Sequence, residues 1–310
     1  MTVSSAEARA AAQPVGDARP PRIVGPGARR WRQFRRHRAA LAGLAVVALL
    51  GVACGLAPLL APYPPEAPNV ELIREPPSLA HPMGTDQLGR DQLSRLMYGG
   101  RFSLEVGVLA TLIAILVGTA FGALSGYYGG ALDPLLMRFT DFMLSIPRLL
   151  LLLMIGAVFG TSIGLIILLI GLTAWMHVAR LVRATVLSLR EQEYIAAARL
   201  LGAGDARLIA RHILPNALGP IIVAATLGVA GAILTESTLS YLGFGVQPPT
   251  PTWGNMLQNA QSEMYNAPWL AIFPGLLIFA TIMSINFIGD GLRDAFDPRR
   301  VSAPRADRRA

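Results

Sequence analysis

The sequence predicts an all-α integral membrane protein with six transmembrane helices, and three observations carry this prediction. Of the 310 residues, 53% are hydrophobic and only 15% are charged, whereas soluble domains usually carry about 25% charged residues. Long apolar runs reach the roughly 20 residues that a helix needs to cross a bilayer, without the short alternating segments of a β-barrel. The arginines flank these runs, which favours a membrane topology signal and no nucleic-acid partner.

The predicted elements follow the apolar runs in order. Residues 1–38 are expected to be a disordered, basic N-terminal tail, because residues 1–28 are rich in Ala, Pro, Gly and Arg without periodicity. A first helix within 39–62 begins too late for a secretory signal peptide, and an outer loop covers 63–100. Residues 101–292 form the main transmembrane domain, and 293–310 form a polar cytoplasmic tail. The six predicted spans are 41–61, 104–126, 142–159, 165–182, 218–239 and 269–288.

The number of spans depends on the stretch from Leu149 to Ala174, which is nearly continuous and could form one long helix. That reading would give five spans and place the termini on opposite sides. With six spans, 23 of the 27 arginines lie on one side and four on the other. Positive charge prefers the cytoplasmic side of short loops. We therefore expect six spans, with both termini in the cytoplasm.

The sequence contains no recognisable catalytic or metal-binding constellation. No H-E-x-x-H motif occurs, and the one G-x-S-x-G match, at residues 160–164, falls in the tight turn expected between the third and fourth spans. The four histidines are scattered, and Cys54 is the single cysteine. The chain has no lysine, so it cannot contain a phosphate-binding P-loop. We expect no catalytic residues, no metal and no cofactor on this chain.

The polar segment 190–216, between the fourth and fifth predicted spans, is the most informative. A helix-compatible stretch with three consecutive alanines ends at Gly202 and Gly204. Asp205 is a suitable N-cap for a second short helix, and Pro215 is expected to close the segment. The pattern predicts a helix–turn–helix elbow on the cytoplasmic face. A solvated basic loop that only fixes topology is the alternative.

This segment resembles the cytoplasmic signature of the permeases of ATP-binding-cassette (ABC) importers: Glu-Ala-Ala, three residues, Gly, nine residues, Ile-x-Leu-Pro. The residues in register are Ala197, Ala198, Gly202, Leu214 and Pro215. The sequence departs at Ala196, where the signature has Glu, and at His212, where it has Ile. The forms of Ala197–Ala203 and Arg211–Asn216 are similar to the dipeptide/oligopeptide branch.

Further motifs of that branch occur in the expected order. They are Gly84–Asp91, Tyr127–Gly130 through Asp141, Ser145–Pro147, Leu242–Gly254 and Gly289–Arg299. Together they cover roughly residues 30–300. The chain is identified as a member of the binding-protein-dependent importer permeases, of the second-permease type.

The resemblance implies a type I ABC importer permease that translocates di- or oligopeptides across the cytoplasmic membrane. ATP and Mg would bind to two partner ATPase subunits, and the other partners would be a homologous permease in a heterodimer, an extracytoplasmic substrate-binding protein and the lipid bilayer. The expected ATPase-coupling residues are Glu193, Tyr194, Ala197, Ala198, Arg199, Gly202, Ala203, Asp205, Arg207, Arg211 and Pro215. For the arginines, a purely topological role is the alternative.

Ionisable residues at membrane depth are functional candidates. Glu236 and Glu105 are candidates for the translocation path, with an interfacial position as the alternative for Glu105. In the outer loop, glycine turns and an Asp–Arg pair are expected to have a structural role. Those residues are Gly84, Thr85, Asp86, Gly89, Arg90 and Asp91.

Three other functions remain open at this point. Relatives that import nickel or glutathione share much of the pattern. A stand-alone secondary transporter would usually need more spans and more intramembrane carboxylates than this chain has. A membrane-embedded enzyme is disfavoured by the missing catalytic motifs.

Overall fold

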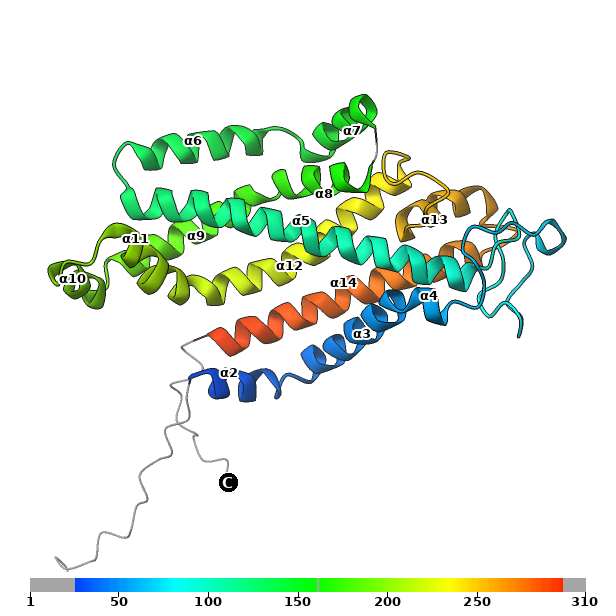
Figure 1. The fold of residues 1–310 in the computed structure, drawn as a ribbon, viewed down its shortest axis with the longest axis horizontal. Coiled ribbons are helices and arrows are strands. Elements are labelled where there is room, and N and C mark those ends of the chain that lie inside the picture. Colours follow the sequence, from blue (N-terminus) through cyan, green and yellow to red (C-terminus); the bar gives the residue numbers. More distant parts are fainter. Residues whose placement is uncertain (1–25, 161, 298–310) are drawn as a thin grey trace, which may run out of the picture.

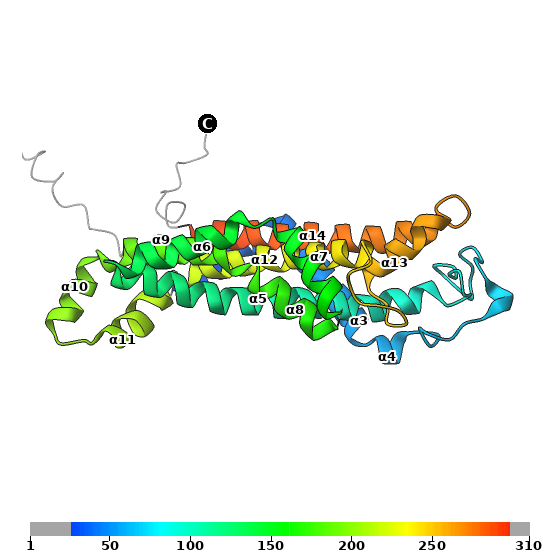
Figure 2. The ribbon, with the colours of Figure 1, turned by 90° about the horizontal axis from the view of Figure 1, so that it is seen from above.

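A computed structural model describes residues 26–160 and 162–297, which form an elongated bundle of long helices (Figures 1 and 2). Within these ranges no β-strand forms, and the pairing of Thr85 with Asp91 is an isolated bridge. The elements are α2 (Pro26–Phe34), α3 (Arg38–Gly55), α4 (Ala57–Leu60), η1 (Val70–Leu72), α5 (Gln92–Tyr128), α6 (Leu132–Ser145), α7 (Arg148–Phe159), α8 (Ile163–Leu172), α9 (Trp175–Arg190), α10 (Glu193–Leu200), α11 (Asp205–Arg207), η2 (Leu208–Ile213), α12 (Leu214–Tyr241), α13 (Trp253–Ala260), η3 (Gln261–Glu263) and α14 (Trp269–Phe296).

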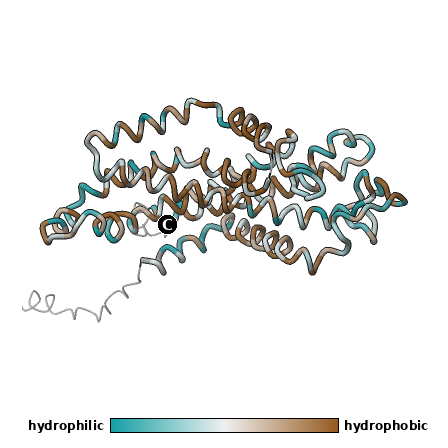
Figure 3. Tube along the Cα trace, turned by 45° about the horizontal axis from the view of Figure 1, so that its top comes forward, coloured by the Kyte–Doolittle hydropathy of each residue, from teal (hydrophilic) through white to brown (hydrophobic). Residues whose placement is uncertain are grey.

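Five helical segments of the described chain are long and apolar enough to cross a membrane, and a bent pair brings the number to six. The five are Arg38–Gly55, Gln92–Tyr128, Ile163–Arg190, Asp205–Tyr241 and Trp269–Phe296. Figure 3 shows hydrophobic residues concentrated along the middle of the bundle. Large apolar side chains such as Leu49 and Phe279 are exposed there, as expected for a surface in contact with lipid rather than water. The chain is therefore a multi-pass membrane protein.

The bent pair corrects the span predicted at 142–159. The chain forms α6 and α7 instead, with an angle of 75° between them. The break lies at Ile146 and Pro147, where Ile146 is extended with ψ of 124°. Proline disfavours helical backbone at the preceding residue and has no N–H to donate. A second turn at Gly160, with φ of +81°, ends α7 before α8 begins. One continuous helix from Leu149 to Ala174 is thus wrong, and the described chain has five candidate spans, or six when the bent pair counts as one span.

Both ends of the described chain differ from the expected tails. Helix α2 occupies residues 26–34, where the sequence predicts disorder, while residues 1–25 lie outside the described part. Phe34 is buried against Ala40 and Ala295, and this contact holds α2 on the bundle. Helix α14 continues to Phe296, inside the predicted tail, and residues 298–310 lie outside the described part. Figure 1 shows α2, the end of α14 and α10 at the same end of the bundle.

Helix α5 runs through the bundle and packs against α9, α8 and α12. A stripe of glycines permits the contact with α9. A Cβ atom at Gly118 would lie 2.6 Å from the Trp175 carbonyl oxygen, and one at Gly122 would lie 2.5 Å from the Ala179 carbonyl oxygen. Small residues spaced four apart allow such close approach of helix backbones in membranes.

Candidate functional site: a helical elbow and a cavity in the bundle

The segment between α9 and α12 forms the predicted elbow. Helix α10 ends at Leu200, and Gly202 adopts φ of +86°, a conformation that glycine permits without strain. The chain then returns through α11 and the π-helical η2 directly into α12. The elbow projects beyond the other helices at one end of the bundle (Figure 1).

Two details of the elbow differ from the sequence prediction. Asp205 is not the N-cap: Gly204 holds that position, and α11 begins at Asp205. The Asp205 carboxylate instead accepts a hydrogen bond of 2.6 Å from the Tyr127 hydroxyl. Pro215 does not close the segment, because it lies in the first turn of α12. The change from the π-helical hydrogen bonding of η2 to the α-helical bonding of α12 falls next to this proline, which has no N–H to donate.

A buried cluster fixes the elbow to the transmembrane helices. Ile195 of α10 and Leu208 and Ile213 of η2 are fully buried. They pack in one core with Val182 and Val186 of α9. Both arms of the elbow therefore share one core with α9, and η2 continues directly into α12.

The tip of the elbow is exposed to solvent, in contrast to its buried base. Leu200 and Leu201 are 89% and 88% exposed. These two leucines are not among the predicted coupling residues, which divide into two groups. Ala198 and Ala203 are half-buried against the core. The exposed ones are Glu193, Tyr194, Ala197, Arg199, Gly202, Asp205, Arg207, Arg211 and Pro215.

Tyr127, at the end of α5, connects the elbow to the centre of the bundle. Besides its bond to Asp205, its hydroxyl accepts from Arg199 Nη2 at 3.4 Å. Arg190 Nη1 donates to the carbonyl oxygens of Gly126 and Tyr127 at 3.0 and 3.2 Å. The sequence marks Tyr127 only as part of a motif and assigns it no role. Arg207 and Arg211 form no ion pair with any residue that the structure describes.

In the outer loop, Asp86 is the centre of a buried hydrogen-bond network. Its carboxylate forms an ion pair of 2.7 Å with Arg90 and lies 3.4 Å from Arg95 Nε. The same carboxylate accepts from the backbone N–H groups of Leu88 and Arg90, each at 2.9 Å. The loop therefore contains an Asp–Arg pair of the expected kind.

The remaining residues of the motif also have structural partners. Asp91 caps α5 by accepting from the Ser94 N–H at 2.7 Å. The Thr85 hydroxyl accepts from the Glu75 N–H at 2.9 Å. Gly84 and Gly89 both have positive φ angles, of 74° and 71°.

The two predicted path carboxylates lie in different surroundings. Glu236 is fully buried and accepts from the hydroxyls of Ser240 at 2.7 Å and Ser103 at 3.1 Å. It thus joins α12 to α5. Glu105 is exposed on α5. Neither residue lines the cavity that α5, α8, α9 and α12 enclose, which is described next.

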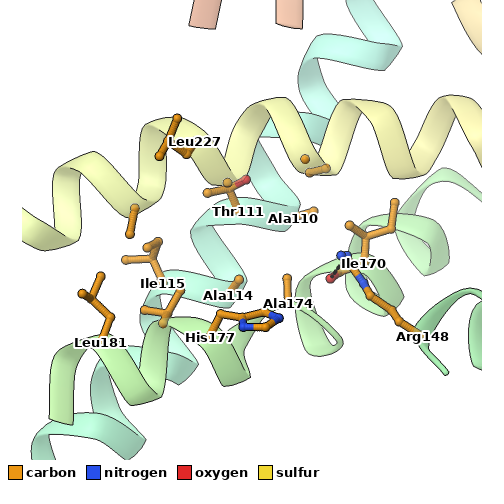
Figure 4. Close-up of a pocket in the computed structure, with 15 residues that line it drawn as sticks. Ala110, Thr111, Ala114, Ile115, Arg148, Ile170, Ala174, His177, Leu181 and Leu227 are labelled. Carbon is orange, nitrogen blue, oxygen red and sulfur yellow. Dashed lines mark hydrogen bonds between the residues drawn. The ribbon is translucent and has the colours of Figure 1, made fainter. Parts of the chain in front are cut away.

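A cavity of about 350 Å³ lies between α5, α8, α9 and α12. Figure 4 shows Arg148 and His177 on the side of the pocket opposite Leu227. Thr111 is the third polar residue of an otherwise apolar lining. From the sequence, Arg148 is only one of the 23 arginines expected on the cytoplasmic side. Its place directly after Pro147, at membrane depth, is the signal that could have identified it.

No group of three or more His, Cys, Asp or Glu residues within 26–160 and 162–297 has the arrangement of a metal site. Neither the elbow nor the cavity contains a nucleophile paired with a base. What the site offers is an exposed apolar tip, a rigid connection from that tip to three helices, and a cationic cavity in the membrane.

Two family models match the chain. Residues 118–302 match the binding-protein-dependent transport system inner membrane component. Residues 25–77 match the N-terminal transmembrane domain of oligopeptide transport permease C.

Curated relatives match over most of both chains. The oligopeptide transport system permease protein OppC of Haemophilus influenzae is 42% identical, over 86% of this chain and 87% of the relative. The dipeptide transport system permease protein DppC of Alkalihalophilus pseudofirmus is 41% identical, over 90% and 92%. The glutathione transport system permease protein GsiD of Pectobacterium atrosepticum is 41% identical, over 88% and 91%.

Solved structures show the same fold. A chain of the MetNI methionine ABC transporter in an inward-facing conformation matches with a TM-score of 0.54 and 20% sequence identity. The match covers 64% of this chain and 94% of the MetNI chain. The sequence prediction of a type I importer permease fold is confirmed.

Proposed function

Since the chain belongs to the family of binding-protein-dependent transport system inner membrane components, we propose that it is the permease subunit of an ATP-driven importer of peptides. It works as a multi-pass protein of the cytoplasmic membrane. The cargo follows from the relatives, which are named for oligopeptide and dipeptide transport. Glutathione, itself a small peptide, is a second candidate, because a relative of similar identity is named for its transport.

The observation that carries the coupling role is the contrast between the exposed tip of the elbow and its buried base. Leu200 and Leu201 present apolar surface to the solvent at one end of the bundle. We propose that they enter a groove on an ATPase subunit. Closure of an ATPase pair would then push the elbow, and the shared core around Ile195 would move α9 and α12 as one body. The bonds of Tyr127 extend this movement to α5. Rocking of rigid helix groups is a general route to alternating access.

The chain requires partners for this cycle. ATP and Mg would bind to two ATPase subunits, because the lysine-free sequence cannot form a P-loop. A homologous permease would complete the pathway as a heterodimer, and an extracytoplasmic protein would deliver the cargo. Arg207 and Arg211, which are exposed on the elbow, are available to carboxylates of the ATPase.

The test is the double substitution Leu200→Asp and Leu201→Asp in the reconstituted complex. Burial of one leucine contributes about 1.5–3 kcal/mol. Loss of two such contacts corresponds to association at least about a hundredfold weaker. We expect that peptide-stimulated ATP hydrolysis in liposomes is lost, or that the ATPase no longer co-purifies. A substitution at Gly202 would strain the turn because of its positive φ angle, and one at Ala198 would disturb the core against which it packs. Leu200 and Leu201 avoid both effects.

Leu79→Asp is the matched control, because Leu79 is a fully exposed leucine in the outer loop. This variant is expected to retain the stimulation. Unchanged stimulation in the elbow variant would show that the elbow is only a topology element, and the proposed coupling would have to be abandoned.

A further inference from the structure

Arg148 lies at membrane depth, and no acidic residue within the described ranges pairs with it. It begins α7, directly after the break in the third span. Its Nε atom donates to the Thr173 hydroxyl at 3.1 Å, and its Nη2 atom donates to the Ile170 carbonyl oxygen at 3.3 Å. The Thr173 hydroxyl donates its own proton to the Leu169 carbonyl oxygen at 2.8 Å. Neutral acceptors thus fix the guanidinium, while Nη1 has no hydrogen-bond partner among the described residues.

The neighbouring arginines are different. Arg183 forms two hydrogen bonds with Asp133, of 2.5 and 2.6 Å. Arg180 is paired with Asp141. Within the described residues, Arg148 has no such carboxylate. An ionised side chain inside a membrane protein is costly and usually marks a site of function. The structure orients this charge but leaves it without a counter-ion.

The same charge borders two cavities. The first is the cavity of about 350 Å³ against α5 and α12, and the second, of about 310 Å³, lies beside the break between α6 and α7. Arg148 and His177 line both of them. No described residue lining either cavity is a carboxylate. The first volume lies in the range of small-molecule sites, about 300–1,000 Å³.

We propose that Arg148 anchors a transit site for the carboxylate group of the cargo, with His177 supplying a second nitrogen. The proposal rests on the proposed import of peptides, whose free C-terminus is a carboxylate. The protons that remain on Nη1 and Nη2 form a fork that matches a carboxylate in bidentate geometry. The apolar walls around Ile115 and Leu227 offer no hydrogen-bonding side chain to the rest of the peptide. The site therefore recognises the C-terminal carboxylate and accepts peptides with varied side chains.

The experiment compares tri-alanine with tri-alanine amide in liposomes that contain the complete complex. Uptake is measured with saturating, peptide-loaded binding protein, and the affinity of the binding protein for each peptide is measured separately. The variants of the chain are Arg148→Gln, Arg148→Lys and Thr173→Val. Arg180→Gln is the matched control, because Arg180 is a nearby arginine that already has an acidic partner.

In the wild type we expect faster uptake of the acid than of the amide. Arg148→Gln is expected to reduce uptake of the acid at least about tenfold, the size of one lost charge-assisted hydrogen bond, and to leave uptake of the amide within about twofold. Thr173→Val is expected to cause a smaller loss, and Arg180→Gln none. An equal reduction for both peptides, or an unchanged ratio, would overturn the proposal.

A second measurement does not depend on transport. The acid peptide is expected to raise the unfolding temperature of the purified wild-type complex more than the amide does, and Arg148→Gln is expected to remove this difference. If Arg148→Gln does not assemble, the proposal is tested with Arg148→Lys and Thr173→Val. If both variants prefer the acid peptide over the amide as strongly as the wild type does, the proposal is overturned. If the wild type takes up neither peptide, the proposed import is wrong, and the temperature shift still decides whether the carboxylate site exists.

Discussion

The glycine stripe on α5 predicts that two methyl groups are enough to separate α5 from α9. Added Cβ atoms at Gly118 and Gly122 would lie 2.6 and 2.5 Å from backbone carbonyl oxygens of α9. Backbone atoms cannot rotate away, so the helices must move apart. Overpacking costs about 1–3 kcal/mol per site, and the better helix propensity of alanine offsets about 1 kcal/mol of this at each. We expect the double variant Gly118→Ala and Gly122→Ala to lose stability, by as much as about 4 kcal/mol.

The matched control is the double variant Gly51→Ala and Gly231→Ala. A Cβ atom at either position would meet no atom within 4 Å, so only the gain in helix propensity remains. The two double variants should therefore change stability in opposite directions. Thermal unfolding of the purified complex measures this as two shifts of opposite sign; about 2–4 °C for each kcal/mol is the range for domains of 150–250 residues, and the shift falls as size increases. An unfolding temperature for the stripe variant equal to that of the control would refute the idea that missing Cβ atoms set the distance between α5 and α9.

Two further predictions concern buried carboxylates. Glu236→Ala should destabilise the bundle by about 2–5 kcal/mol, because the hydroxyls of Ser103 and Ser240 lose their acceptor and a cavity remains. Glu236→Gln keeps the shape of the side chain and one acceptor, so it should lower the unfolding temperature clearly less. Asp86→Ala should cost about 3–5 kcal/mol by leaving Arg90 and Arg95 buried without a counter-ion, which limited proteolysis of the outer loop would report; an unchanged cleavage rate would contradict this.

The sequence predicts the structural features that depend on long apolar runs and on helix-breaking residues. The spans and the elbow follow from such signals, and the turn at Gly202 is where the sequence places it. The break inside the third span was missed because the run 142–159 begins before Pro147. A proline near a predicted start is compatible with a straight helix, so only the tertiary structure reveals that α6 precedes it.

Contacts between distant segments could not be predicted. Tyr127 and Asp205 are 78 residues apart, and no spacing rule connects a tyrosine at the end of one helix with the first residue of another. Glu236 was expected as a path residue because it is a carboxylate in a span. The hydroxyls that surround it come from Ser103 on α5 as well as from its own helix, and this pairing is visible only once the helices are packed.

Contact between the elbow tip and an ATP-binding subunit is the central claim, and site-specific cross-linking tests it most directly. The chain has a single cysteine, Cys54, which is buried. In a Cys54→Ala background, Leu201→Cys and, as the control, Leu79→Cys would each carry a photoreactive label in the assembled complex. We expect cross-links to the ATP-binding subunit from position 201 that change in yield when ATP is added, and none from position 79. No cross-link from position 201, or equal labelling from both positions, would contradict it.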